Sequence, residues 1–165
     1  MSFKNVEDRY AMDVLDAILS GARAPGGWLH SELRGKKLVY EVHAYSILGL
    51  DPRHFEIFAM TRPDTVDQVL AIIDGFIGKM KRGKFSDDEL DRAKTLCATE
   101  ETLEQRGNAN LAAQAALDEL YGLGYDFSQH YTERINAVTR ADVIRVANKY
   151  LTHKVTAIAT CKEGK

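Results

Sequence analysis

Two stretches of alternating side chains, 38–48 and 54–61, constrain the fold more than any other part of this chain. In each stretch apolar residues recur at every second position, which is typical of a strand with one buried face. Between them, segment 49–53 (Gly-Leu-Asp-Pro-Arg) has the composition of a turn, and its proline suits no central strand position. The pattern predicts an antiparallel hairpin, and a turn centred near Leu50 and Asp51 would place His54 opposite Ile47.

Helical spacing of apolar residues dominates the rest of the chain. Ser86 and Glu89 form a capping box at the start of one helix, and Thr139 is a suitable N-cap for another. A last alternating segment, 154–161, predicts a third strand that joins the hairpin. The helices are expected over residues 6–19, 28–33, 63–82, 86–103, 109–121, 128–137 and 139–150.

This order of elements predicts an α+β fold, in which a small, mainly antiparallel sheet packs against several helices. With 165 residues, the chain has the length of one domain, 1–165, with its own core. Three strands make a thin sheet for this length, since typical sheets have about 4–6. We therefore expect that a strand is missing before residue 3.

Composition disfavours several classes of function. The 22 Lys and Arg residues are balanced by 24 Asp and Glu residues, so no global positive charge points to nucleic acid or to an anionic membrane. No stretch approaches the ~20 apolar residues of a membrane span, and the first residues lack the apolar core of a signal peptide. We expect a soluble chain, whose compartment the sequence leaves open.

No metal or nucleophile site is evident among the five histidines and two cysteines. Zinc peptidase chemistry needs two histidines on one helix face beside a glutamate, and no such pair occurs. His43 and His54 would lie roughly 13 Å apart along the hairpin, at about 3.3 Å per residue, too far for one ion. Cys97 falls in an apolar helical stripe and Cys161 in the predicted last strand, so both are interpreted as buried thiols.

A basic turn leads into the first strand and ends at an aromatic residue. Arg34, Lys36 and Lys37 precede Tyr40 within segment 31–42. Guanidinium, ammonium and phenol groups all donate hydrogen bonds to carbonyl or carboxylate oxygens, so this cluster could hold a peptide. Taken alone, the same pattern also fits a solvated basic turn beside a strand aromatic.

Four segments, in order and at similar spacing, resemble the C-terminal-type half-domain of the insulinase/pitrilysin zinc metallopeptidases, also called inverzincins. The first resembles the family's v-L-x-x-i-L-x-G helix, the second its L-x-x-e-L-R…g-L-a-Y segment, and the last two its late helices. The segments are 14–21, 29–40, 117–127 and 137–151. The resemblance implies the half-domain fold of the insulinase and mitochondrial processing peptidase type.

In that family, repeated half-domains form a chamber, and one of them carries zinc on the motif H-x-x-E-H. The resemblance implies that this chain is the non-catalytic half, with no catalytic or metal-binding residue of its own. Arg34 and Tyr40 would contact the peptide substrate, whereas zinc would reside in a partner half-domain or subunit. The family's step from arginine to tyrosine is one residue longer, so Lys36 or Lys37 is an alternative for the basic position. A rival reading is an inactive domain that serves only structure or interaction.

Two further expectations follow from the resemblance. Half-domains of the family begin with a strand before the first helix, and this chain has only residues 1–5 there. The domain would thus be excised from a longer protein, and its exposed sheet edge would favour self-association. Alone, the chain is expected to bind no stoichiometric zinc and to cleave no peptide.

Overall fold

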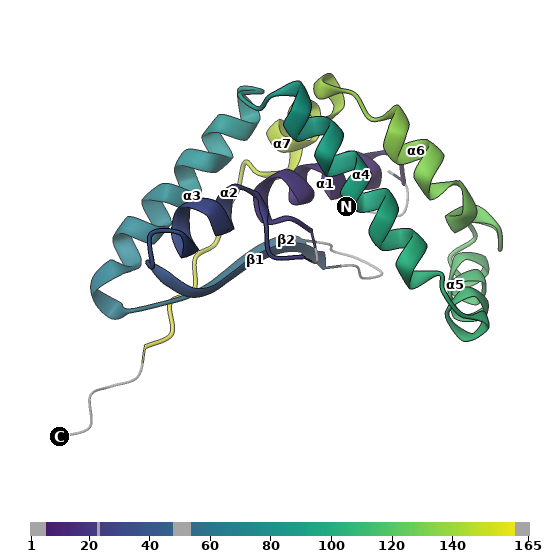
Figure 1. Ribbon diagram of the computed structural model, residues 1–165, viewed down its shortest axis with the longest axis horizontal. Coiled ribbons are helices and arrows are strands. Elements are labelled where there is room, and N and C mark those ends of the chain that lie inside the picture. Colours follow the sequence, from purple (N-terminus) through teal and green to yellow (C-terminus); the bar gives the residue numbers. More distant parts are fainter. Residues whose placement is uncertain (1–5, 23, 48–53, 161–165) are drawn as a thin grey trace.

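The computed structural model describes residues 6–22, 24–47 and 54–160. Helices arch over one side of a β-hairpin, and α4 and α5 extend beyond its end (Figure 1). The described elements, in chain order, are α1 (Val6–Ser20), α2 (Gly27–Leu29), the π-helical η2 (His30–Arg34), β1 (Val39–Ile47), β2 (His54–Thr61), the 3-10 turn η3 (Pro63–Thr65), α3 (Val66–Lys81), α4 (Asp87–Glu104), α5 (Asn108–Leu120), the 3-10 turn η4 (Phe127–His130), α6 (Tyr131–Ala137) and α7 (Arg140–Tyr150).

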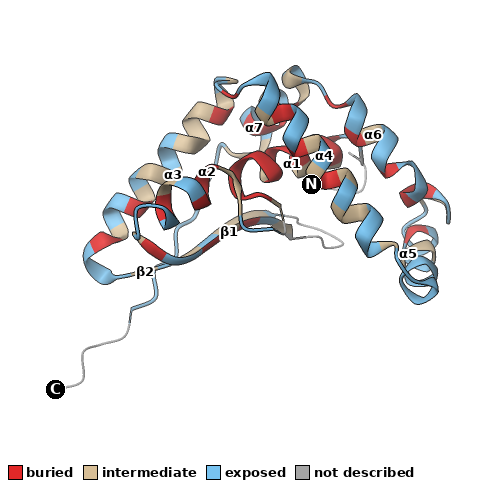
Figure 2. Ribbon diagram, viewed as in Figure 1, coloured by how far each residue is buried: buried red, intermediate tan, exposed pale blue. Residues whose placement is uncertain are grey.

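Helix α1 is the centre of the core. Val14, Leu15 and Leu19 are fully buried, and α1 contacts β1, α4, α6 and α7 (Figure 2). A helix that is apolar around most of its circumference is stable only when neighbours surround it. Asp8 of α1 binds Arg145 and Lys149 of α7 and so ties the two helices together.

The sheet consists of β1 and β2, which pair antiparallel, as predicted. Ile47 pairs with His54, which confirms the register expected from the turn. The turn itself, at 49–53, lies outside the described residues. A register irregularity falls between Val39 and Glu41, so Tyr40 occupies a bulge at the start of β1.

Side chains of the hairpin divide between two faces. On the inner face, Val42 and Ala44 are buried, and Phe55, Ile57 and Ala59 of β2 pack partly against the same core. We call the opposite side the outer face, which carries Glu41, His43, Tyr45, Glu56, Phe58 and Met60. Three of these are exposed large side chains: Tyr45, Phe58 and Met60.

Local signals in the sequence set the helix boundaries. Ser86 accepts a hydrogen bond from the backbone of Glu89, whose carboxylate accepts one in return, so the predicted capping box opens α4. Thr139 and Asp142 form a second capping box at α7. Cys97 is buried in α4, as expected from its apolar stripe. No helix in the described ranges is both long and apolar enough to cross a bilayer.

The predicted third strand is wrong for the part of it that is described. Residues 154–160 form no strand, and every one of them is exposed. Val155 is 99% exposed, and Lys154 is held by Asp74 of α3 rather than by a neighbouring strand. A strand needs a partner with which to exchange backbone hydrogen bonds, and the described sheet provides none beside this segment.

Candidate functional site

Arg34 and Tyr40 lie at either end of the turn that joins η2 to β1. Leu33 is fully buried at the end of η2, and its carbonyl accepts a hydrogen bond from Leu38 N at 2.8 Å. Lys37 N donates to Arg34 O at 2.9 Å, and this second hydrogen bond closes a shorter turn inside the first. The chain therefore reverses within a few residues and presents 34–37 and Tyr40 at one end of β1.

Gly35 is essential to this geometry. A Cβ built on Gly35 would lie 2.2 Å from the backbone oxygen of Ser31, a distance that no side chain tolerates. The wide π-helical turn brings that oxygen close, because Gly35 N donates to His30 O five positions back. Glycine at this position thus allows the helical turn to continue directly into the basic segment.

The proposed contact residues are all exposed. Tyr40 is 64% exposed at its bulge, and Arg34 and Lys37 are exposed in the turn. Lys36 forms an ion pair with Glu32, one helical turn earlier. Within the described part of the chain, the side chains of Arg34 and Tyr40 have no hydrogen-bond or ion-pair partner, so both are open to an external ligand.

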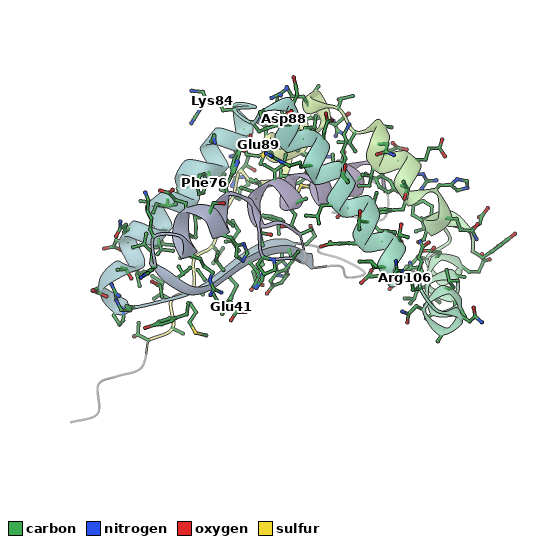
Figure 3. The ribbon with its side chains drawn as sticks, viewed as in Figure 1. Glu41, Phe76, Lys84, Asp88, Glu89 and Arg106 are labelled. Atoms are coloured by element: carbon green, nitrogen blue, oxygen red, sulfur yellow. The ribbon has the colours of Figure 1, made fainter. Side chains whose placement is uncertain are left out.

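Beyond the turn, the outer face of the sheet carries mixed polar and aromatic groups. Figure 3 shows Glu41 on the side of the sheet opposite Phe76 of α3. Tyr45 donates to Glu56 across the strands at 3.0 Å, and this hydrogen bond to a carboxylate raises the pKa of Tyr45. The outer face is thus only partly covered: Tyr45, Phe58 and Met60 are exposed, whereas His43 packs against His30 of η2.

A cavity of about 400 Å³ adjoins the outer face. Its lining comes from α1, the turn after it, the sheet, α4 and α6: Arg9, Asp13, Asp16, Ala22, Glu41, His43, Ala44, Tyr45, Ser46, Phe58, Cys97, Glu100, Glu101, Glu104 and Tyr131. Six of these side chains are carboxylates and one is an arginine. We call this cavity the acidic groove.

Burial controls ionisation in the acidic groove. It raises the pKa of Asp16 to about 7, with a smaller opposing effect of the hydrogen bond from Ser20 and a further increase from Asp13 and Glu100. Burial likewise raises the pKa values of the Cys97 thiol and the Tyr131 phenol. Cys97 is thus held as a thiol and is unsuited to nucleophilic chemistry.

The histidines make one contact that the sequence did not predict. His43 lies far from His54 along the hairpin, as expected, since it pairs with Phe58. However, the ring of His43 packs edge-on against that of His30, with 5.3 Å between centroids. Within the ranges that the structure describes, no group of three His, Cys, Asp or Glu side chains could hold a metal ion.

Sequence reasoning found the Arg34 and Tyr40 turn but missed the acidic groove. Asp13 and Asp16 on α1 and Glu100, Glu101 and Glu104 on α4 follow helical spacing, which placed each set on one helix face. Such charged faces usually contact solvent. Only the packing of α1 beside α4 and β1 brings the two acidic faces together.

Comparison with known proteins gives one family and many similar structures. The family described as the peptidase M16 inactive domain matches residues 2–97. The inactive peptidase domain of a proposed zinc protease from Bordetella parapertussis is 21% identical, with a TM-score of 0.76, over 92% of this chain and 82% of that one.

Two longer chains are also similar. A peptidase M16 inactive domain from Pseudomonas fluorescens is 28% identical, with a TM-score of 0.74, over 88% of this chain and 34% of that one. A protease from Helicobacter pylori is 23% identical, with a TM-score of 0.72, over 92% of this chain and 36% of that one. This chain thus spans about a third of the length of either protein. No curated protein sequence gives a match.

Proposed function

The chain belongs to the peptidase M16 inactive-domain family, and from this membership we propose that it is the non-catalytic half of a zinc metalloendopeptidase, in which it forms chamber wall and contacts the peptide substrate. The zinc ion and the general base would come from a partner half-domain or subunit, because the sequence contains no H-x-x-E-H. The parent protein would be the longer polypeptide or complex that contains both halves.

The observation that supports substrate contact is the exposure of Arg34 and Tyr40 at one end of the sheet. Both side chains point donors to solvent from a turn held by buried Leu33 and by Gly35. A guanidinium and a phenol so placed can bind the backbone oxygens of a peptide, or stabilise the negative charge that develops on the scissile carbonyl. In this way they would supplement zinc as Lewis acid.

We further propose that residues 1–165 form a single half-domain whose sheet lacks its first strand. The two-stranded described sheet and the unpaired segment 154–160 support this proposal. The missing strand would come from elsewhere in the parent protein or from a partner.

A rival function is an inactive structural or interaction domain of the same fold. The observation in its favour is α5, which exposes Leu111, Leu117 and Leu120 and resembles a docking helix more than a catalytic element. If this rival function is correct, Arg34 and Tyr40 are ordinary surface residues that contact no substrate.

Restoring the zinc-carrying half tests the two functions against each other. In the reconstituted enzyme, Tyr40→Phe and Arg34→Ala are each expected to lower kcat/KM for peptide hydrolysis by about 10²-fold, the order of magnitude for losing one donor to the transition state. The matched controls are Tyr125→Phe and Arg106→Ala, exposed residues beyond the sheet, which are expected to change hydrolysis less than twofold.

The hydrolysis rates of these variants distinguish the substrate-contacting half-domain from the structural domain. Unchanged hydrolysis in both Tyr40→Phe and Arg34→Ala would favour the structural domain. If only Arg34→Ala has no effect, the variants Lys36→Ala and Lys37→Ala identify the basic residue. The isolated chain serves as the blank and is expected to cleave nothing.

A further inference from the structure

We propose that Thr61 is a positioning residue for Tyr40, because its hydroxyl fixes the strand entrance at which a bulge turns Tyr40 out of the core. This inference rests on the proposed function, since the position of Tyr40 affects hydrolysis only if Tyr40 contacts the substrate. Thr61 acts through Tyr40 and is not itself a substrate contact.

The bulge at the start of β1 decides which way Tyr40 faces. Between Val39, which pairs with Thr61, and Glu41, β1 advances two residues while β2 advances one. Side chains alternate between faces along a regular strand, so without the bulge Tyr40 would share the buried face of Val42. The extra residue breaks this alternation: Val39 is buried, whereas Tyr40 is 64% exposed. Bulges re-aim side chains in this way next to active sites.

The Thr61 hydroxyl holds the carbonyl group that precedes the bulge. Thr61 Oγ1, at the end of β2, donates to Leu38 O at 2.6 Å. On its other side, Leu38 N donates to the carbonyl of the fully buried Leu33 at 2.8 Å. Both backbone polar groups of Leu38 are therefore bound, one to η2 and the other to β2. The chain thus enters β1 at a fixed position, two residues before Tyr40.

A second hydroxyl orients the first. Thr65 is buried in η3, and its Oγ1 lies 2.7 Å from Thr61 Oγ1 and 3.1 Å from Arg62 O. A hydroxyl has one proton to donate. Because Thr61 gives its proton to Leu38 O, the 2.7 Å contact uses the proton of Thr65. The two threonines therefore form a directional chain of hydrogen bonds that ends at Leu38, and each bond strengthens the next.

Loss of the Thr61 hydroxyl would affect Tyr40 more than the rest of the fold. The Leu38 carbonyl would be left without this donor, and an acceptor that loses its partner away from solvent is costly. The strand entrance would then adopt other arrangements, including the regular pairing that returns Tyr40 toward the core. The helices, which Thr61 does not hold in place, would keep their packing.

Fluorine NMR of the isolated chain tests the positioning without zinc or hydrolysis. The seven tyrosines are replaced by 3-fluorotyrosine, and Tyr40→Phe identifies the resonance of residue 40. Thr61→Val keeps the shape but removes the donor, so it is expected to shift or split this resonance and to leave the others in place. Thr61→Ser keeps the hydroxyl and is expected to restore the wild-type spectrum. The matched control is Thr99→Val, which removes a hydroxyl bonded within α4 and should leave residue 40 unchanged.

Hydrolysis by the reconstituted enzyme tests whether Thr61 acts through Tyr40. Thr61→Val is expected to lower kcat/KM about tenfold, less than the ~10²-fold that a seriously misplaced group can cost. In the Tyr40→Phe background the same change is expected to lower kcat/KM less than twofold, because no phenol is left to position. Such non-additivity is the signature of two residues that act together.

An unchanged residue-40 resonance in Thr61→Val, or equal changes in Thr61→Val and Thr61→Ser, would overturn the proposal. An equal loss of kcat/KM with and without the Tyr40 phenol would do so too. If Thr61→Val does not fold, Thr65→Val removes the hydroxyl that contacts Thr61 Oγ1 and is judged by the same spectra. Wild-type hydrolysis by Tyr40→Phe refutes the proposed substrate contact, whereas the fluorine spectra separately decide whether Thr61 fixes Tyr40.

Discussion

Asp8 and Asp16 lie about two turns apart on α1 and ionise at very different pH. Burial opposes ionisation of Asp8, but hydrogen bonds from Lys149, Tyr150 and Arg145 outweigh it and hold the pKa at about 2. Burial also raises the pKa of Asp16, and the charges of Asp13 and Glu100 raise it further. The hydrogen bond from Ser20 lowers this pKa only in part, so it stays at about 7. The two residues therefore link stability to pH with opposite signs.

The sign follows from proton binding in the folded and unfolded chains. Asp8 has a lowered pKa, so its stabilisation is complete above about pH 3.8 and is lost as the pH falls through about 2. Asp16 has a raised pKa, so between about pH 4 and 7 the folded chain keeps a proton that the unfolded chain releases. Stability from this residue declines as the pH rises through that window.

At the residue scale, Asp16→Asn is expected to stabilise the chain at pH 8 by about 1–3 kcal/mol, because the neutral amide needs no proton and still accepts from Ser20. Urea denaturation at several pH values between 4 and 8 measures the effect. The variant should lose the decline that the wild type shows over this range. Asp88→Asn is the control, and an unchanged decline in Asp16→Asn would contradict the pKa assignment.

At the scale of elements, η2 and α3 use glycine for different reasons. Gly35 ends η2 where a side chain would collide with Ser31 O, so its lack of a Cβ is a steric requirement. Gly75 lies inside α3, where an added Cβ would meet nothing within 4 Å. In a helix interior, glycine loses more conformational entropy on folding than alanine does, and at Gly75 no close contact requires the absence of a side chain.

Matched substitutions should therefore have opposite effects. Gly35→Ala is expected to lower the free energy of unfolding by about 1–3 kcal/mol, because the added Cβ overlaps Ser31 O and the turn must shift to make room for it. Gly75→Ala is expected to raise it by about 0.5–1 kcal/mol. Chemical denaturation measures both. Equal stability of Gly35→Ala and wild type would show that the turn relaxes, and that it does not constrain the positions of Arg34 and Tyr40.

At the scale of the whole molecule, the chain leaves apolar and strand-forming surface uncovered. Leu120 is 76% exposed on α5, and most of that helix lies at the surface (Figure 2). Val155 and Ile158 are exposed in a segment that has the composition of a strand but no strand partner in the described sheet. Surfaces of this kind recruit partners.

We expect the isolated chain to self-associate with increasing concentration. Sedimentation velocity should show oligomers that Leu120→Lys or Val155→Lys reduces, because a charge on either surface costs free energy when it is covered. Leu103→Lys, which changes an exposed leucine on α4, is the control. It is expected to leave the oligomers unchanged if self-association uses α5 and segment 154–160. A strict monomer at high concentration in the wild type would refute the prediction.

The sequence by itself determined features that depend on neighbours along the chain. The alternation and turn composition placed Ile47 opposite His54, and the Ser86 and Thr139 caps began the predicted helices. The family resemblance and the small antiparallel sheet packed by helices are likewise confirmed. These features are predictable because capping, turn formation and side-chain periodicity act over a few residues.

Only the tertiary structure decided what depends on distant partners. Segment 154–160 has the alternation of a strand, but strand formation needs a second backbone and the described sheet does not provide one. The acidic groove exists because α1 and α4 pack side by side, so that burial raises the pKa of Asp16 to about 7. Desolvation and charge coupling depend on distance in space, and the order of residues along the chain does not reveal that distance.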